Sequence, residues 1–280
     1  MSRFDYGVCE WSVRARGHQL AEMAAKSGLD CLQLGVGTEV FRGEGLADPG
    51  RVESYLSAGE KYGITIHSLS PQFVDEYSFT MAKSQAEEEI AVRLVEKTME
   101  LSRTFGCKSF LLPILGKNDI VDGASFHKAV EYIKGFADEA AKDNMETWLE
   151  INQSAERVRD LLDAVDHPMV RIFFDSQNLY AQNGTSMARY FKDLEDVIGG
   201  VHLKDGKGSM LSGSLLGMGT SGFRKTAEAI LESRYSGCLI IESVYDKPGV
   251  CHLGTEEELL ARDAATLRET FEKGEKENDQ

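Results

Sequence analysis

The chain has 280 residues, of which 42% are hydrophobic and 28% are charged, and it carries a formal net charge of −15. This composition is typical of a globular protein with a sizeable core, whereas the negative charge repels phosphates and anionic lipids and so disfavours nucleic acid and membrane partners. The N-terminus lacks the apolar segment of a secretory signal and no apolar run approaches the ~18 residues of a membrane span, which predicts a cytoplasmic protein.

Short apolar runs alternate with amphipathic stretches along the whole chain. The runs predict eight buried strands. They are 6–12 (YGVCEWS), 31–35 (CLQLG), 64–70 (ITIHSLS), 109–114 (SFLLPI), 147–151 (TWLEI), 170–174 (VRIFF), 200–204 (GVHLK) and 238–243 (CLIIES). The amphipathic stretches predict eight helices. They are Gly17–Ser27, Arg51–Tyr62, Gln85–Phe105, Ser125–Lys142, Ser154–Val165, Met187–Asp196, Phe223–Ser233 and Glu256–Lys273.

Regular strand–helix alternation over about 270 residues is typical of a (β/α)8 TIM barrel, whose usual size is ~250 residues. An open, doubly wound sheet is the competing architecture. The chain has no shift of composition and no linker rich in proline or glycine, which favours one closed α/β domain. We therefore expect a single barrel over residues 1–273, followed by a polar, flexible tail over residues 274–280.

Polar side chains lie at or near the ends of the last four predicted strands: Glu150, Asp175, His202 and Glu242. In a parallel barrel these ends lie on one face, where the active site is built. Three carboxylates and an imidazole suit Mn²⁺ or Mg²⁺, with Co²⁺ or Zn²⁺ as alternatives. Taken singly, Asp175 is equally typical of a turn or a helix cap, and His202 of a core histidine. Burying three carboxylates together without a cation is costly, which favours one metal site for the set.

The strand ends LEIN, FFDSQN, HLKD and IIES, in this order and spacing, resemble those of the xylose-isomerase-like sugar isomerase and epimerase barrels. The resemblance covers nearly the whole chain. It implies that Glu150, Asp175, His202 and Glu242 bind one divalent metal ion and that the two glutamates exchange protons with the substrate. Relatives in this superfamily pair or form tetramers, so the resemblance is compatible with a homo-oligomer.

One position departs from the pattern of this family. Many of these epimerases carry a histidine that contacts substrate three residues after the aspartate, and the chain has Asn178 there. Asparagine hydrogen-bonds a hydroxyl but carries neither a proton nor a charge. We expect Asn178 to bind substrate without taking part in proton transfer.

Five further residues are candidate substrate contacts. His67 lies near the end of the third predicted strand, and Glu10 and Trp11 follow the first, where they would form a pocket wall. Lys204 and Lys207 follow the seventh strand, where a lysine would neutralise an enolate, a carboxylate or a phosphate. The competing interpretations are a core histidine, ordinary packing of the tryptophan and solvated loop lysines.

The segment GMGTSG, residues 217–222, matches the pattern GxGxxG. It lacks the preceding strand and the acidic residue about 20 positions later that a dinucleotide site requires, which excludes a Rossmann motif. Two interpretations remain: backbone N–H groups that bind an anionic end of the substrate, or an ordinary tight loop.

The expected function is that of a metal-dependent isomerase or epimerase of a small sugar, keto-sugar or sugar phosphate. The metal would polarise the carbonyl, and Glu150 or Glu242 would move the α proton through an enediolate. The alternative is a lyase that dehydrates an inosose-like or keto-acid substrate at the same site. A DNA repair endonuclease of the same superfamily is disfavoured, because the chain has only six histidines and a negative charge.

Overall fold

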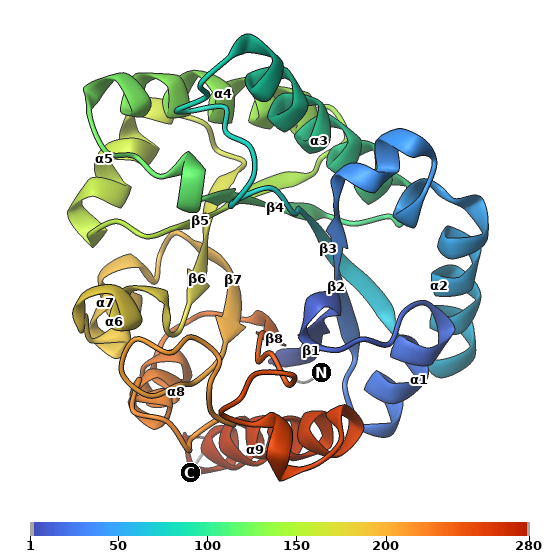
Figure 1. Cartoon of the computed structure of the whole chain (residues 1–280). Helices are drawn as coiled ribbons and strands as arrows, with labels where there is room; N and C mark the ends of the chain where they lie inside the picture. Colours follow the sequence, from blue (N-terminus) through green and yellow to red (C-terminus); the bar gives the residue numbers. More distant parts are fainter. Residues whose placement is uncertain (1–2, 279–280) are drawn as a thin grey trace. The chain divides into compact units, whose positions relative to one another are not determined.

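The computed structural model describes residues 3–278. Eight strands are hydrogen-bonded in chain order and the sheet closes between β8 and β1, with helices in the connections (Figure 1), which confirms the predicted (β/α)8 barrel. The strands are β1 (Phe4–Cys9), β2 (Cys31–Val36), β3 (Thr65–Pro71), β4 (Ser109–Ile114), β5 (Glu146–Ile151), β6 (Val170–Asp175), β7 (Ile198–Leu203) and β8 (Gly237–Ile241). The α-helices over the described residues are α1 (His18–Lys26), α2 (Pro49–Tyr62), α3 (Gln85–Thr104), α4 (Gly123–Ala141), α5 (Ala155–Val165), α6 (Asn178–Asn183), α7 (Met187–Leu194), α8 (Phe223–Glu232) and α9 (Glu256–Asn278).

Local sequence accounts for where the elements begin and which face they bury. Ser154 caps α5 by accepting a hydrogen bond from the backbone N–H of Arg157, and Asp122 forms a capping box with Ser125 at the start of α4. Every residue of β4 is buried, as expected for a parallel strand covered on both faces.

The structure differs from the predicted elements in several places. The first strand ends at Cys9 and the next three residues form a 3-10 helix (Glu10–Ser12), where the Arg16 guanidinium binds the carbonyls of Glu10 and Val13. Helix α6 is an additional short helix. Helix α9 continues to Asn278, while the flexibility of residues 274–280 stays a prediction and residues 279–280 lie outside the described part.

The chain forms two compact units. The first contains the residues up to Gln33, residues Ser57–Thr65 and the residues from Phe174 onward, and the second contains Leu34–Leu56 and Ile66–Phe173. The core of the first unit includes Phe4, whose ring packs edge-on against Phe271, with ring centroids 5.2 Å apart.

The core of the second unit is also aromatic. Phe79 lies with its ring centroid 5.7 Å from that of Phe136 and 5.2 Å from that of Tyr132.

Within residues 3–278, no helix combines the length and the apolar character needed to cross a membrane.

Strand register in the first unit determines which of its polar residues lie beside one another. Cys9 on β1 lies opposite Gln33 on β2, and Val8 lies opposite Ile241 on β8. His202 on β7 pairs with Ile240. Because side chains alternate along a strand, Glu242 points to the same face as Ile240, one pleat further on. Cys9 at the end of β1, Gln33 on β2, His202 on β7 and Glu242 after β8 thus bring a thiol, an amide, an imidazole and a carboxylate together.

Candidate metal centre

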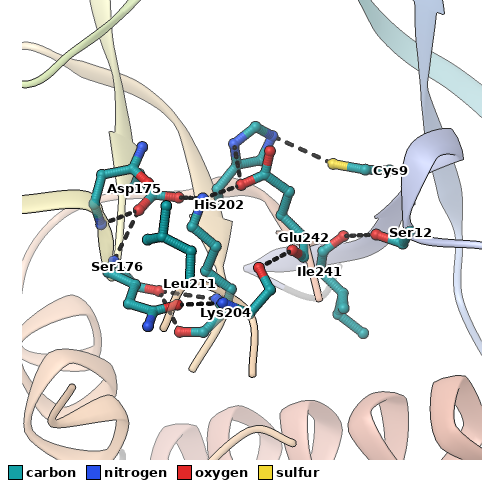
Figure 2. Close-up of polar contacts among 12 residues, drawn as sticks. Cys9, Ser12, Asp175, Ser176, His202, Lys204, Leu211, Ile241 and Glu242 are labelled. Atoms are coloured by element: carbon teal, nitrogen blue, oxygen red, sulfur yellow. Dashed lines mark hydrogen bonds and ion pairs between the residues drawn. The ribbon is translucent and has the colours of Figure 1, made fainter. Parts of the chain in front are cut away.

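Asp175 ends β6 and uses its two oxygens differently. Its Oδ1 accepts hydrogen bonds from the backbone N–H groups of Gln177 (2.8 Å) and Asn178 (2.6 Å), at the start of α6. Its Oδ2 lies 2.9 Å from the Lys204 Nζ. The two interpretations of this aspartate are therefore compatible, because one oxygen caps the turn and the other faces the candidate site (Figure 2).

His202 and Glu242 lie beside this second oxygen. The His202 imidazole is completely buried and its Nδ1 lies 3.6 Å from Glu242 Oε2. Asp175, His202 and Glu242 each offer one ligand atom, and these atoms lie within 4.8 Å of one another. Figure 2 shows the three side chains converging from β6, β7 and the end of β8. Two carboxylates and one imidazole at this separation fit a divalent cation.

The Lys204 ammonium already provides a positive charge between the carboxylates. Its Nζ contacts both Asp175 Oδ2 and Glu242 Oε2. Burial alone would raise the pKa of Glu242, but the charge of Lys204 and hydrogen bonds from Lys204 and Trp11 outweigh it and lower this pKa to about 2. Glu242 is consequently an ionised carboxylate at neutral pH.

Trp11 orients this carboxylate. Its indole Nε1 donates a 3.0 Å hydrogen bond to Glu242 Oε1, and its ring packs edge-on against the His202 ring, with centroids 6.2 Å apart. The predicted pocket wall thus has direct contact with two candidate ligands. Glu10, the other predicted wall residue, is buried and pairs with Arg16 at 3.2 Å.

The remaining predicted residues lie at different places. Glu150 is buried on β5, in the second unit, and Lys207 is exposed in the loop after β7. Asn178 is half-buried at the first position of α6.

His67 requires a correction of its expected position. It is the third residue of β3 and therefore lies toward the amino end of the strand. It lines a pocket with Ser109 and Glu146, the first residues of β4 and β5, and its ring packs on Trp148 with centroids 5.5 Å apart. Strand register explains this position, because the neighbouring Ser68 pairs with Ser109, the first residue of β4. Its role in substrate binding stays a prediction.

The glycine-rich segment 217–222 encloses a carboxylate of the chain itself. Asp205, almost completely buried, accepts hydrogen bonds from the backbone N–H groups of Gly217 (3.0 Å), Gly219 (2.9 Å) and Ser221 (3.3 Å) and from the Ser221 hydroxyl (2.7 Å). A Cβ atom at Gly219 would lie 2.1 Å from the Asp205 Oδ1, so glycine is required there. The N–H groups considered for a substrate anion are therefore bound to Asp205.

A second buried aspartate connects the loop after β7 to the segment after β8. Asp263, on α9, accepts hydrogen bonds from the Leu216 N–H (2.8 Å), the Ser243 hydroxyl (2.8 Å) and the Tyr245 hydroxyl (3.0 Å). Burial raises the pKa of Asp263 to about 6, although these hydrogen bonds act in the opposite direction. Because Ser243 follows Glu242 directly, Asp263 restrains the backbone of a candidate ligand.

Sequence reasoning missed Gln33, Asp205 and Asp263. Each had a signal in the sequence. Gln33 is a lone polar residue in the apolar run CLQLG, and buried polar groups in strands need partners. Asp263 lies at the apolar spacing of α9, three residues after Leu260 and four before Leu267. Asp205 directly follows the predicted Lys204, beside a glycine-rich loop.

Comparisons with known proteins agree with this architecture. The chain is 25% identical to a 2-epi-5-epi-valiolone 7-phosphate 2-epimerase from Actinoplanes sp. over 275 residues, which are 96% of this chain and 97% of that protein. A D-psicose 3-epimerase from Clostridium cellulolyticum H10, solved with D-tagatose, superposes with a TM-score of 0.75 at 16% identity, covering 97% of this chain and 99% of that chain. A probable 3-DHS dehydratase of petrobactin synthesis from Bacillus anthracis gives a TM-score of 0.72 at 14% identity, covering 94% and 98%.

The match that assigns the family covers most of the barrel. The family model described as xylose isomerase-like TIM barrel matches residues 21–270. This range includes β2 to β8 and the ends of all four strands that carry the predicted ligands. The chain therefore belongs to the xylose isomerase-like TIM barrel family.

Proposed function

We propose that the protein is a divalent-metal-dependent isomerase or epimerase of a small sugar, keto-sugar or sugar phosphate. The observation that carries the proposal is the group of Asp175, His202 and Glu242, whose ligand atoms lie within 4.8 Å of one another and of which Asp175 and His202 are buried. We propose Glu150 as the fourth ligand, because its strand end LEIN belongs to the four-part pattern in which the family resemblance implies four ligands. The donor set favours Mn²⁺ or Mg²⁺, with Co²⁺ or Zn²⁺ as alternatives.

The ion, when bound, would act as a Lewis acid that polarises a substrate carbonyl. Glu242 is ionised and is held by Trp11 and Lys204, so it is oriented to accept a proton from a carbon beside that carbonyl. Moving the Lys204 ammonium toward a substrate oxygen would remove the main interaction that lowers the pKa of Glu242. Its pKa would then rise, and the carboxylate would become a stronger base while Lys204 stabilises the developing oxyanion.

The second proton-transfer group is assigned to Glu150 in this proposal. Return of the proton to the opposite face of the same carbon gives an epimer, and return to the neighbouring carbon gives an isomer. Asn178 would hydrogen-bond a substrate hydroxyl, because an amide carries no transferable proton at neutral pH.

One comparison supports a phosphorylated substrate within this class. The relative at 25% identity is named for epimerisation of a 7-phosphate.

Metal content and proton exchange test the proposal together. We expect about one divalent ion per chain in protein purified without chelator, measured by plasma mass spectrometry, and solvent deuterium in a ketose or keto-sugar substrate. Asp175→Asn is the matched variant, because asparagine keeps the Oδ1 that caps α6 but loses the charge of the second oxygen. A wild-type protein that takes up no ion on titration would contradict the proposal. New ultraviolet absorbance from an unsaturated product would instead identify the dehydratase alternative.

A further inference from the structure

Among the described hydrogen bonds of the His202 ring, the one with Gln33 is the shortest. Its Oε1 lies 2.6 Å from His202 Nε2, and both side chains are completely buried. Gln33 is the third residue of β2 and lies opposite Cys9, whose Sγ donates to the same Oε1 at 3.4 Å. An amide carbonyl oxygen only accepts hydrogen bonds, so the short contact requires the proton of a neutral imidazole to reside on Nε2.

The other ring nitrogen faces the carboxylates. His202 Nδ1 lies 3.6 Å from Glu242 Oε2, on the side of the ring away from Gln33. With the proton on Nε2, the lone pair of Nδ1 points toward Glu242 and is available to a cation. With the opposite tautomer, Nδ1 would carry a proton and the ring could not be a ligand at this position.

We infer that Gln33 is a positioning residue that fixes the Nε2–H tautomer of His202 and thereby presents Nδ1 as a metal ligand. This inference rests on the proposed function for its metal-binding part, whereas the tautomer is a property of the metal-free protein. The second partner of Nε2 is weaker, since Cys9 Sγ lies 3.4 Å away and thiols form weak hydrogen bonds. Cys9 is therefore a natural control for Gln33.

The arrangement also decides between two candidate ligand groups. Cys9, His202 and Glu242 likewise offer atoms within 4.8 Å of one another. Cys9 lies at the Nε2 side of the ring, where Gln33 already binds the proton. The thiol and the carboxylate Oε2 therefore approach opposite ring nitrogens, and the group with Asp175 is the better cation site.

The direct test is the nitrogen spectrum of His202. In the 15N-labelled, metal-free wild-type protein at pH 8, long-range 1H–15N correlation is expected to show a protonated Nε2 and an unprotonated Nδ1. Gln33→Met, which keeps the length of the side chain but loses the acceptor, is expected to change the tautomer population. Gln33→Glu restores an acceptor and should restore the wild-type tautomer, while Cys9→Ala should leave it unchanged. A wild-type Nδ1–H tautomer, or the same spectrum in Gln33→Met, would overturn the inference.

Metal affinity provides the second readout. Competition with a fluorescent chelator for Mn²⁺ is expected to show affinity in Gln33→Met weaker by about 10- to 100-fold, which is typical when the outer partner of a histidine ligand is removed. Equal affinity in Gln33→Met and wild type would overturn the positioning role even if the wild type binds the ion. If the wild type binds no ion, the proposed function fails, and the nitrogen spectrum alone still decides whether Gln33 fixes the tautomer. A folding defect in Gln33→Met leaves the wild-type spectrum and Gln33→Glu as the deciding measurements.

Discussion

Replacing Asp263 by Asn is expected to remove a large part of the pH dependence of stability. The side chain is completely buried and burial raises its pKa from 3.8 to about 6. The folded protein therefore binds this proton more tightly than the unfolded chain, and the free energy of unfolding falls as the pH rises through the window from 3.8 to about 6. A difference of about two pH units corresponds to about 3 kcal/mol. Most of this, about 2 kcal/mol, falls between about pH 4.5 and 7.5.

Asparagine is the appropriate replacement because it resembles the protonated acid. Its Oδ1 still accepts from the Leu216 N–H, and the Ser243 and Tyr245 hydroxyls can rotate to accept from its amide. Urea unfolding of wild type and Asp263→Asn, followed by circular dichroism at intervals across this pH range, gives the difference in unfolding free energy. The stability of the wild type relative to the variant should fall by about 2 kcal/mol from the acidic to the neutral end. A difference that stays constant within about 0.5 kcal/mol would show that Asp263 does not titrate in this window.

Three further results are expected. Lys204→Met should bind Mn²⁺ at least about tenfold more tightly than the wild type, whereas Lys204→Arg should not. The methionine variant loses an ammonium that competes with the ion for the carboxylates, and a unit charge 4 Å from a carboxylate is worth ~4 kcal/mol at an effective dielectric constant of 20. An unchanged or weaker affinity of the methionine variant in isothermal titration would contradict this expectation. Asp205→Asn places amide hydrogens against backbone N–H groups and should speed hydrogen exchange across residues 206–222, and unchanged protection there would contradict the role of Asp205. Dialysis against a chelator should lower the melting temperature, and Mn²⁺ at 100 times its dissociation constant should restore ~2.7 kcal/mol of stability; a melting temperature that ignores both treatments would argue against a resident ion.

The sequence was sufficient for the barrel because its strands have both faces covered. Runs such as VRIFF are apolar throughout, and this pattern is typical of parallel strands between helices. The same runs located Asp175 and His202, because a polar residue at the end of a buried strand interrupts the pattern. Helix α6 escaped prediction because its six residues are too few for a periodic signal and its start depends on the cap from Asp175.

The partners of the site residues could not be predicted in the same way. Gln33 contacts His202 across 169 positions of the chain, and Asp263 contacts Leu216 across 47. Local periodicity does not report such contacts, since they depend on which strands become neighbours. The position of His67 was wrong for a related reason, because its place along the barrel depends on the pairing of Ser68 with the first residue of β4, which the sequence does not show.

The carboxylate of Asp205 occupies the place that a bound anion takes in other glycine-rich turns, because it accepts the hydrogen bonds of the N–H groups in the loop after β7. In nucleotide-binding proteins a glycine-rich turn is ordered by the phosphate it receives, but here the turn has its shape before any substrate arrives. Ordering of this segment therefore belongs to folding and not to substrate binding. The exposed Met210 and Leu211 belong to the same loop, so their side chains are attached to a backbone that Asp205 holds in place.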